Sequence, residues 1–114
     1  MAVVLVADDD ACIRHLICTV LKSAGHRCFE AANGLEAVAL FRSNRDSVDL
    51  VITDLTMPVM DGREVIARIR ETRSAVPVIC MSGYTDCPMP PGVHPLPKPF
   101  TAPRLLKIIA EILQ

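Results

Sequence analysis

Three apolar runs constrain the fold of this chain more than any other feature of its sequence. VVLVA (residues 3–7), LVIT (residues 50–53) and VPVICM (residues 76–81) contain almost no polar residues. Runs of this kind are typical of strands that are buried on both faces of a parallel sheet. Apolar residues at helical spacing separate the runs, so we expect strands to alternate with helices and to form right-handed βαβ units.

Two weaker strands complete the predicted order, at residues 27–31 and 93–96. Polar and flexible residues indicate where the helices begin and end. Asp10 is the predicted N-cap of the first helix, Gly25 is expected just beyond its end, and Thr101 is the predicted N-cap of the last helix. The fold class predicted from this order is α/β, with a parallel sheet.

Composition excludes several classes of function. The chain has 114 residues, 51% of them apolar, which is enough for the core of a single domain over residues 1–114. The 12 basic and 13 acidic residues give a net charge of -1, whereas nucleic-acid binding needs a basic surface. The first ten residues do not form a signal peptide, and no apolar run reaches the ~18 residues of a membrane span. We therefore expect no nucleic-acid or membrane partner and a cytoplasmic location.

The five cysteines of the chain show no metal-ligand spacing. Cys12, Cys18, Cys28 and Cys80 lie in apolar contexts, where a reduced thiol acts as a small apolar side chain. We expect these four thiols to be reduced, in keeping with a cytoplasmic protein.

Polar residues follow the ends of four of the predicted strands. They are, in chain order, Asp8, Asp9, Asp10, Asp54, Ser82 and Lys98. In open parallel sheets the working site lies beyond the carboxyl ends of the strands, so we expect these side chains to converge there.

The chemistry of this set indicates phosphoryl transfer. Converging carboxylates repel one another unless a cation neutralises them, and oxygen ligands suit a hard ion such as Mg²⁺. A hydroxyl and an ammonium group at the same edge suit an anion with several oxygens. The set therefore predicts a divalent metal, a phosphoryl group and a carboxylate that accepts it. Each feature alone has a plainer explanation: aspartates that cap a helix or loop, a Ser82-Gly83 turn, and a Lys98 side chain that covers Phe100.

Four motifs, in order, resemble the receiver domain of two-component response regulators. They are VLVADDDACIR, ITDLTMPVMDG, PVICMSG and PLPKPF. Their order and spacing match over essentially the whole chain, except between Tyr84 and Leu96. The resemblance implies a flavodoxin-like, doubly wound, five-stranded parallel sheet with the strand order 2-1-3-4-5.

The resemblance also assigns roles around a metal. It implies that Asp54 is the phosphoacceptor. Mg²⁺ would be bound by Asp9, Asp54 and the main-chain carbonyl of Thr56, and Asp8 would support the metal through water.

The remaining roles concern the anion and the partner. The resemblance implies that Lys98 pairs with the acceptor carboxylate and then with a phosphoryl oxygen, that Ser82 hydrogen-bonds the phosphoryl group, and that the bond between Lys98 and Pro99 is cis. The donor would be a phosphohistidine of a histidine kinase or of a histidine phosphotransfer protein. The chain would be a signalling switch and not a turnover enzyme. A covalently attached kinase or effector domain outside this chain is compatible with the resemblance.

Two other functions fit parts of the sequence. A haloacid-dehalogenase-type phosphatase also forms an aspartyl phosphate beside Mg²⁺, and Asp8 with Asp10 supplies its Asp-x-Asp motif. In that case Asp54 would have no purpose, and acidic ligands shortly after Lys98 are missing. A receiver-like module that no longer switches would keep the fold without the signal. The complete acceptor set argues against lost chemistry but not against lost signalling.

The connection between Ser82 and Lys98 departs from the family. It has only 15 residues, and 5 of the chain's 9 prolines lie in it. A helix, a strand and two loops need roughly 20 residues or more, and the prolines in residues 88–91 interrupt a helix. Pro95 also stands where the family has a switch aromatic. We therefore expect the fourth helix, between the fourth and fifth strands, to be absent or vestigial, and phosphorylation to order residues 84–92.

Overall fold

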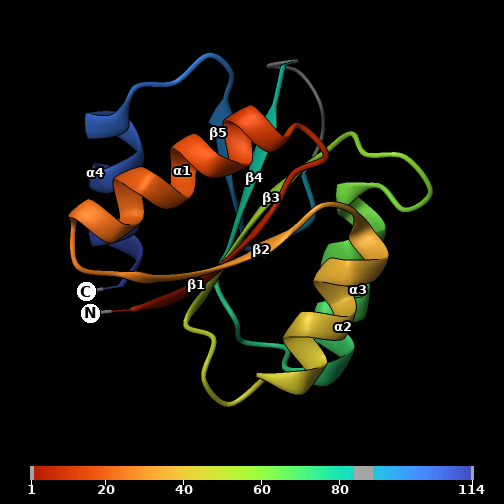
Figure 1. The fold of residues 1–114 in the computed structure, drawn as a ribbon. Coiled ribbons are helices and arrows are strands. Elements are labelled where there is room, and N and C mark those ends of the chain that lie inside the picture. Colours follow the sequence, from red (N-terminus) through yellow and green to blue (C-terminus); the bar gives the residue numbers. More distant parts are fainter. Residues whose placement is uncertain (1, 84–88, 114) are drawn as a thin grey trace.

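The computed structural model describes residues 2–83 and 89–113 and shows a five-stranded sheet between helices (Figure 1). The elements are β1 (Val3–Ala7), α1 (Ala11–Ser23), β2 (Arg27–Ala31), α2 (Gly34–Ser43), β3 (Leu50–Asp54), α3 (Gly62–Thr72), β4 (Val78–Ser82), β5 (Val93–Pro97) and α4 (Ala102–Ile112). All neighbouring strands are parallel, in the order β2-β1-β3-β4-β5. The predicted flavodoxin-like fold class and strand order are confirmed. Within the described ranges, none of the helices has both the length and the apolar character needed to cross a membrane.

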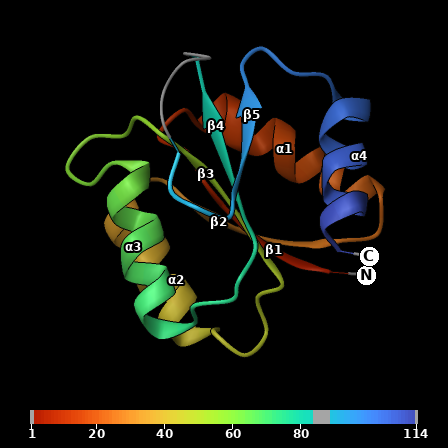
Figure 2. The same cartoon turned by 180° about the vertical axis from the view of Figure 1, so that it is seen from behind.

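In the described part of the chain, two helices cover each face of the sheet. α1 and α4 lie on one face, and α2 and α3 lie on the other (Figure 1 and Figure 2). Successive side chains of a strand point to opposite faces, and β1 follows this rule. Val4 and Val6 join the core under α1 and α4, whereas Leu5 and Ala7 join the core under α2 and α3. Because both faces are buried, the strands need the continuous apolar runs seen in the sequence.

Polar caps determine where the helices begin. Each helix follows a side chain that accepts hydrogen bonds from main-chain amides of its first turn, and these caps are Asp10, Asn33, Asp61 and Thr101. Gly25, with a φ of +88°, follows the end of α1. The predicted caps at Asp10 and Thr101 and the predicted terminator at Gly25 are confirmed.

The strand ends differ slightly from those expected. β4 begins at Val78 and not at residue 76, because Pro77 has no N–H for the ladder. At their carboxyl ends β3 extends to Asp54 and β4 extends to Ser82. Both polar residues are therefore held by the sheet itself and not by a loop.

The expected loss of a helix between β4 and β5 is not confirmed. That prediction falls mainly on residues 84–88, which lie outside the described residues. The described residues of the connection, 83 and 89–92, contain no helix, and the fourth helix among the described residues is α4, after β5. The expected ordering of residues 84–92 on phosphorylation also falls mostly outside the described part.

The expectation that four cysteines are reduced is wrong for two of them. Cys18 and Cys28 form a disulfide, with their Cα atoms 5.9 Å apart, whereas Cys12 and Cys80 form no disulfide among the described residues. Cys18 lies on the buried side of α1, and Cys28 lies in β2, the strand that returns beside this helix. Apolar context therefore did not distinguish a buried thiol from a cross-linked one, because the turn at Gly25 decides which residues face each other.

The disulfide is expected to stabilise the fold measurably. Closing a loop of about ten residues removes conformational entropy from the unfolded chain, worth roughly 2–3 kcal/mol. Adding a reductant should therefore lower the melting temperature of the parent by about 10 °C, measured by circular dichroism. A variant with both Cys18→Ser and Cys28→Ser should not respond to the reductant. Rapid alkylation of both thiols in the unreduced parent would show that the bond does not form.

Candidate functional site

Three carboxylates meet at the carboxyl edge of the sheet. β1 and β3 are neighbouring strands, and Ala7 is in register with Thr53. The residues that follow this pair, Asp8 and Asp54, therefore lie side by side. Asp8, Asp9 and Asp54 each offer one carboxylate oxygen, and these oxygens lie within 4.8 Å of one another. The structure thus brings together the three acidic residues singled out from the sequence.

The three carboxylates differ in their access to solvent. Asp8 is 0% exposed, Asp54 is 9% exposed, and Asp9 lies in the exposed class. A reagent that approaches the edge of the sheet can therefore reach Asp54, but it cannot reach Asp8. Asp10, the fourth acidic candidate, turns to the cap of α1, where its Oδ1 accepts from the Cys12 amide at 2.9 Å.

The Asp8 carboxylate is short of partners. Its Oδ1 accepts a hydrogen bond from the Asp10 amide at 2.9 Å, but its buried Oδ2 has no hydrogen-bond partner among the described residues. Burial is the main cause that raises the pKa of Asp8, and the negative charges of Asp54 and Asp9 raise it further. The Asp10 amide and the Lys98 ammonium oppose this rise.

Lys98 lies between two of the carboxylates. Its Nζ is 3.3 Å from Asp54 Oδ1 and 3.5 Å from Asp8 Oδ2. The Lys98 amide donates to the Ser82 carbonyl at 2.8 Å, which fixes the start of the loop after β5. The bond between Lys98 and Pro99 is cis, as the family resemblance implied.

Ser82 and Thr56 complete the predicted set. Ser82 ends β4, is 5% exposed, and comes one residue after Met81, the register partner of Asp54. Thr56 lies in the loop after β3, two residues beyond Asp54, and is exposed. The phosphoryl contact of Ser82 and the carbonyl ligand at Thr56 remain predictions.

The residues present fit a hard divalent cation. Three carboxylates face a single ammonium group among the described residues of the cluster, so negative charge is in excess. The buried Oδ2 of Asp8 has no hydrogen-bond partner among the described residues, and the Lys98 ammonium forms only a long ion pair with it, at 3.5 Å. A bound cation would therefore satisfy this oxygen and offset the excess negative charge. Carboxylate oxygens are ligands that Mg²⁺ prefers.

Sequence reasoning missed the residues that hold this edge in place. The Thr53 hydroxyl donates to the Asp54 carbonyl at 3.0 Å. A Cβ atom at Gly62 would lie 2.4 Å from the same carbonyl oxygen, so only glycine fits there. Arg14 donates from Nη1 to the Asp8 carbonyl at 2.7 Å. The available signals were the glycine directly after Asp61 and a basic residue one helical turn after Asp10.

Comparison with known proteins identifies the family. The response regulator receiver domain matches residues 4–110 of this chain. The chain belongs to this family. It is therefore a receiver domain of two-component signalling, the class expected from the four motifs.

Individual relatives of the receiver agree with this assignment. The sensor kinase CckA of Brucella abortus is 32% identical over 99% of this chain, which spans only 13% of that kinase. The sporulation initiation phosphotransferase F of Bacillus subtilis is 36% identical over 75% of this chain and 68% of its own length. Among solved structures, the response regulator TrrA of Thermotoga maritima in complex with Mg²⁺ and BeF has a TM-score of 0.89 and 30% identity, covering 99% of this chain and 100% of that one.

Proposed function

We propose that this receiver accepts a phosphoryl group on Asp54, with Mg²⁺, from the phosphohistidine of a histidine kinase or a histidine phosphotransfer protein. The modification then changes which proteins the receiver binds. One observation carries the proposal: the Asp54 carboxylate is nearly buried, at 9% exposure, and lies 3.3 Å from the Lys98 ammonium and beside two further carboxylates.

The transfer requires little from the chain beyond position and charge. A carboxylate oxygen of Asp54 attacks the phosphorus, the P–N bond to the donor imidazole breaks, and its electron pair stays on the imidazole nitrogen. Lys98 orients the attacking carboxylate and afterwards pairs with a phosphoryl oxygen. The Ser82 hydroxyl donates to another phosphoryl oxygen. The product is an acyl phosphate that remains on the protein.

A bound Mg²⁺ neutralises the negative charge that Asp54 and the incoming phosphoryl group bring together. Asp9, Asp54 and the Thr56 carbonyl would hold the ion, and Asp8 would support it through water. The presence of Mg²⁺ and BeF in the complex of the related Thermotoga receiver supports this part of the proposal.

The exposure of Asp8 and Asp54 distinguishes a receiver from a dehalogenase-type phosphatase. That reaction would make Asp8 the nucleophile, but Asp8 is 0% exposed and Asp54 is the residue that a reagent reaches. Because the phosphoryl group stays on the chain, we assign a switch and not a turnover enzyme. Labelling with acetyl phosphate and Mg²⁺, followed by mass-spectrometric mapping, tests this directly. The label should lie on Asp54, and a label on Asp8 would contradict the proposal.

We place the partner surface on α1 and the loop after β5. A shallow cavity of about 440 Å³ is lined there by Ile13, Leu16, Lys98, Pro99 and Phe100. Leu16 is 60% exposed and lies beside Ile13 and Phe100 in this lining, so apolar side chains border the acidic site here. Lys98 borders both this cavity and Asp54, so a partner bound here brings its phosphohistidine to the acceptor. We propose no nucleic-acid or membrane partner for this surface.

We also propose where the receiver is located and which domains accompany it. We treat residues 1–114 as one domain, and a kinase or effector attached outside them is suggested by the small share of CckA that the chain spans. We propose a cytoplasmic location, where the ATP that feeds such kinases is available. Disulfides are typical of oxidising compartments, so the state of Cys18 and Cys28 in cells tests this location. Reduced thiols would agree with the cytoplasm, and a disulfide in cells would contradict it.

The acyl phosphate is expected to be long-lived. Its hydrolysis needs a water in line with the phosphorus, and Thr56 carries neither an acid nor an amide that would orient it. The ring of Tyr84, two residues beyond Ser82, would also shield the phosphoryl group from water, although Tyr84 lies outside the described residues. Thr56→Asn combined with Tyr84→Ala should speed the loss of label severalfold, measured by intact mass after removal of the donor. An unchanged or longer lifetime would count against this explanation.

A further inference from the structure

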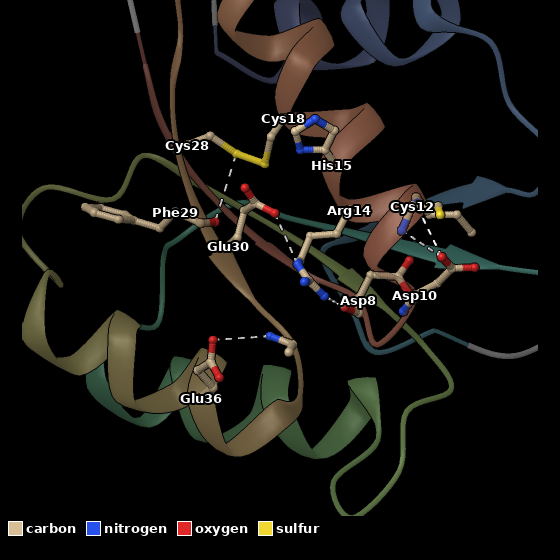
Figure 3. Close-up of polar contacts among 12 residues, drawn as sticks. Asp8, Asp10, Cys12, Arg14, His15, Cys18, Cys28, Phe29, Glu30 and Glu36 are labelled. Atoms are coloured by element: carbon tan, nitrogen blue, oxygen red, sulfur yellow. Dashed lines mark hydrogen bonds and ion pairs between the residues drawn. A yellow bond between two sulfur atoms is a disulfide. The ribbon is translucent and has the colours of Figure 1, made fainter.

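Arg14 connects three parts of the receiver beside the acidic site (Figure 3). It belongs to the first turns of α1. Its Nε lies 3.2 Å from Glu30 Oε1 in β2, and its Nη1 donates to the main-chain carbonyl of Asp8 at 2.7 Å. The Arg14 side chain is 17% exposed, and its contact with the Asp8 carbonyl is partly buried. The contact with Glu30, whose side chain is 36% exposed, lies at the surface. The fork of donors on a guanidinium group allows one residue to make both contacts at once.

The carbonyl that Arg14 binds belongs to the loop that carries the carboxylates. The Asp8 amide donates to the Ala31 carbonyl at 3.1 Å, and the Asp8 Oδ1 accepts from the Asp10 amide at 2.9 Å. Arg14 adds the third attachment of the same residue. Asp9 lies between Asp8 and Asp10, which the hydrogen bond from the Asp10 amide joins. Arg14 therefore helps to fix the main chain that positions the Asp9 carboxylate.

We propose that Arg14 is a positioning residue for the metal site, and that Glu30 acts through Arg14 by orienting its guanidinium group. The inference rests on the proposed function, because it assigns Mg²⁺ to Asp8, Asp9 and Asp54. Mg²⁺ demands near-ideal ligand geometry, so a small shift of the Asp8–Asp9 main chain weakens binding. Residues that hold metal ligands without touching the metal typically change metal affinity by about 10–100-fold when they are replaced.

The test is a titration of each folded variant with Mg²⁺ alone, in which amide chemical shifts report the binding. Arg14→Ala should raise the dissociation constant about tenfold. Arg14→Lys should recover part of the affinity, since an ammonium group can donate to the Asp8 carbonyl but cannot also hold Glu30 in a fork. Glu30→Gln should weaken binding less than Arg14→Ala. It should have no further effect when Arg14 is already alanine.

Arg68→Ala is the matched control, because it breaks a similar ion pair on α3, in which Arg68 Nη2 lies 3.4 Å from Glu64 Oε1. It should leave Mg²⁺ affinity unchanged. A merely structural Arg14 would lower the melting temperature without moving the dissociation constant. A change of less than threefold in Arg14→Ala would therefore overturn the inference, and so would a Glu30→Gln effect that persists without Arg14. If Arg14→Ala does not fold, Arg14→Lys and Glu30→Gln decide, and an unchanged dissociation constant in both variants would overturn the inference.

The failure of the proposed function would look different. If the parent does not bind Mg²⁺, or if Asp9→Asn binds it as tightly as the parent, the metal site itself is wrong and the role of Arg14 falls with it. If the parent binds Mg²⁺ through Asp9 and Arg14→Ala binds equally well, only the role of Arg14 is overturned.

Discussion

Asp54→Asn is expected to abolish labelling of the receiver by acetyl phosphate in the presence of Mg²⁺. An amide oxygen is a much weaker nucleophile than a carboxylate, and an amide cannot form the acyl phosphate by simple displacement. Asp8, the neighbouring carboxylate, cannot substitute, because it is 0% exposed. Intact-mass spectrometry measures the loss of labelling, because each phosphoryl group that is incorporated adds to the mass of the protein.

The control for this change is Asp46→Asn, which removes an exposed aspartate in the connection between α2 and β3. It should be labelled as fast as the parent. Chelating the metal should abolish labelling of both the parent and the control, because the acceptor carboxylate then repels the incoming anion. An Asp54→Asn protein labelled as well as the parent would contradict the central claim of the proposed function.

The convergence of these residues could be predicted from the sequence for a physical reason. Parallel strands end at one edge of the sheet, so polar residues that follow different strands become neighbours without any knowledge of side-chain contacts. This reasoning placed Asp8, Asp9 and Asp54 together, and it placed Lys98 beside them. It needed only the alternation of strands and helices and the position of each residue after its strand.

Contacts that depend on how a helix is rotated against a strand could not be read in the same way. The disulfide between Cys18 and Cys28 and the ion pair between Arg14 and Glu30 both join α1 to β2. Each pair is separated by ten residues or more, and neither residue of a pair carries a local pattern that points to the other. Their distances follow from the packing of α1 on the sheet, which the turn at Gly25 sets.

Asp8→Asn is expected to stabilise the metal-free receiver at neutral pH. In the parent, the buried Oδ2 of Asp8 has no hydrogen-bond partner among the described residues and only a long ion pair with Lys98, at 3.5 Å. Burial outweighs this ion pair and raises the pKa of the carboxyl group. An asparagine keeps the oxygen that accepts from the Asp10 amide and removes the charge. The free energy of unfolding should rise by roughly 1–3 kcal/mol, the usual cost of an unsatisfied buried polar group. Thermal unfolding in a chelating buffer measures the change.

The effect should depend on pH in one direction. The pKa of Asp8 is higher in the folded protein than the ordinary 3.8 of the unfolded chain, so between these two values the folded state binds more protons. The free energy of unfolding of the parent therefore falls as the pH rises through this window. Below pH 3.8 the carboxyl group is neutral in both states, and the advantage of Asp8→Asn over the parent should shrink there. A stability difference that stays constant from acidic to neutral pH would contradict this account.

Mg²⁺ should reduce the stability advantage of Asp8→Asn over the parent. A ligand that binds only the folded state stabilises it by about 2.7 kcal/mol at a hundred times its dissociation constant. The parent should gain this stabilisation, whereas Asp8→Asn, with one carboxylate fewer near the ion, should gain less at the same Mg²⁺ concentration. Asp46→Asn should follow the parent within about 0.5 kcal/mol in both buffers, as expected of an exposed substitution. If Asp8→Asn melts below the parent without metal, repulsion and desolvation at Asp8 do not limit the stability of the receiver. If instead it gains as much from Mg²⁺ as the parent does, Asp8 does not support the metal. The chelating buffer thus measures how much the buried charge of Asp8 destabilises the fold, and the Mg²⁺ buffer measures how much that charge contributes to metal binding.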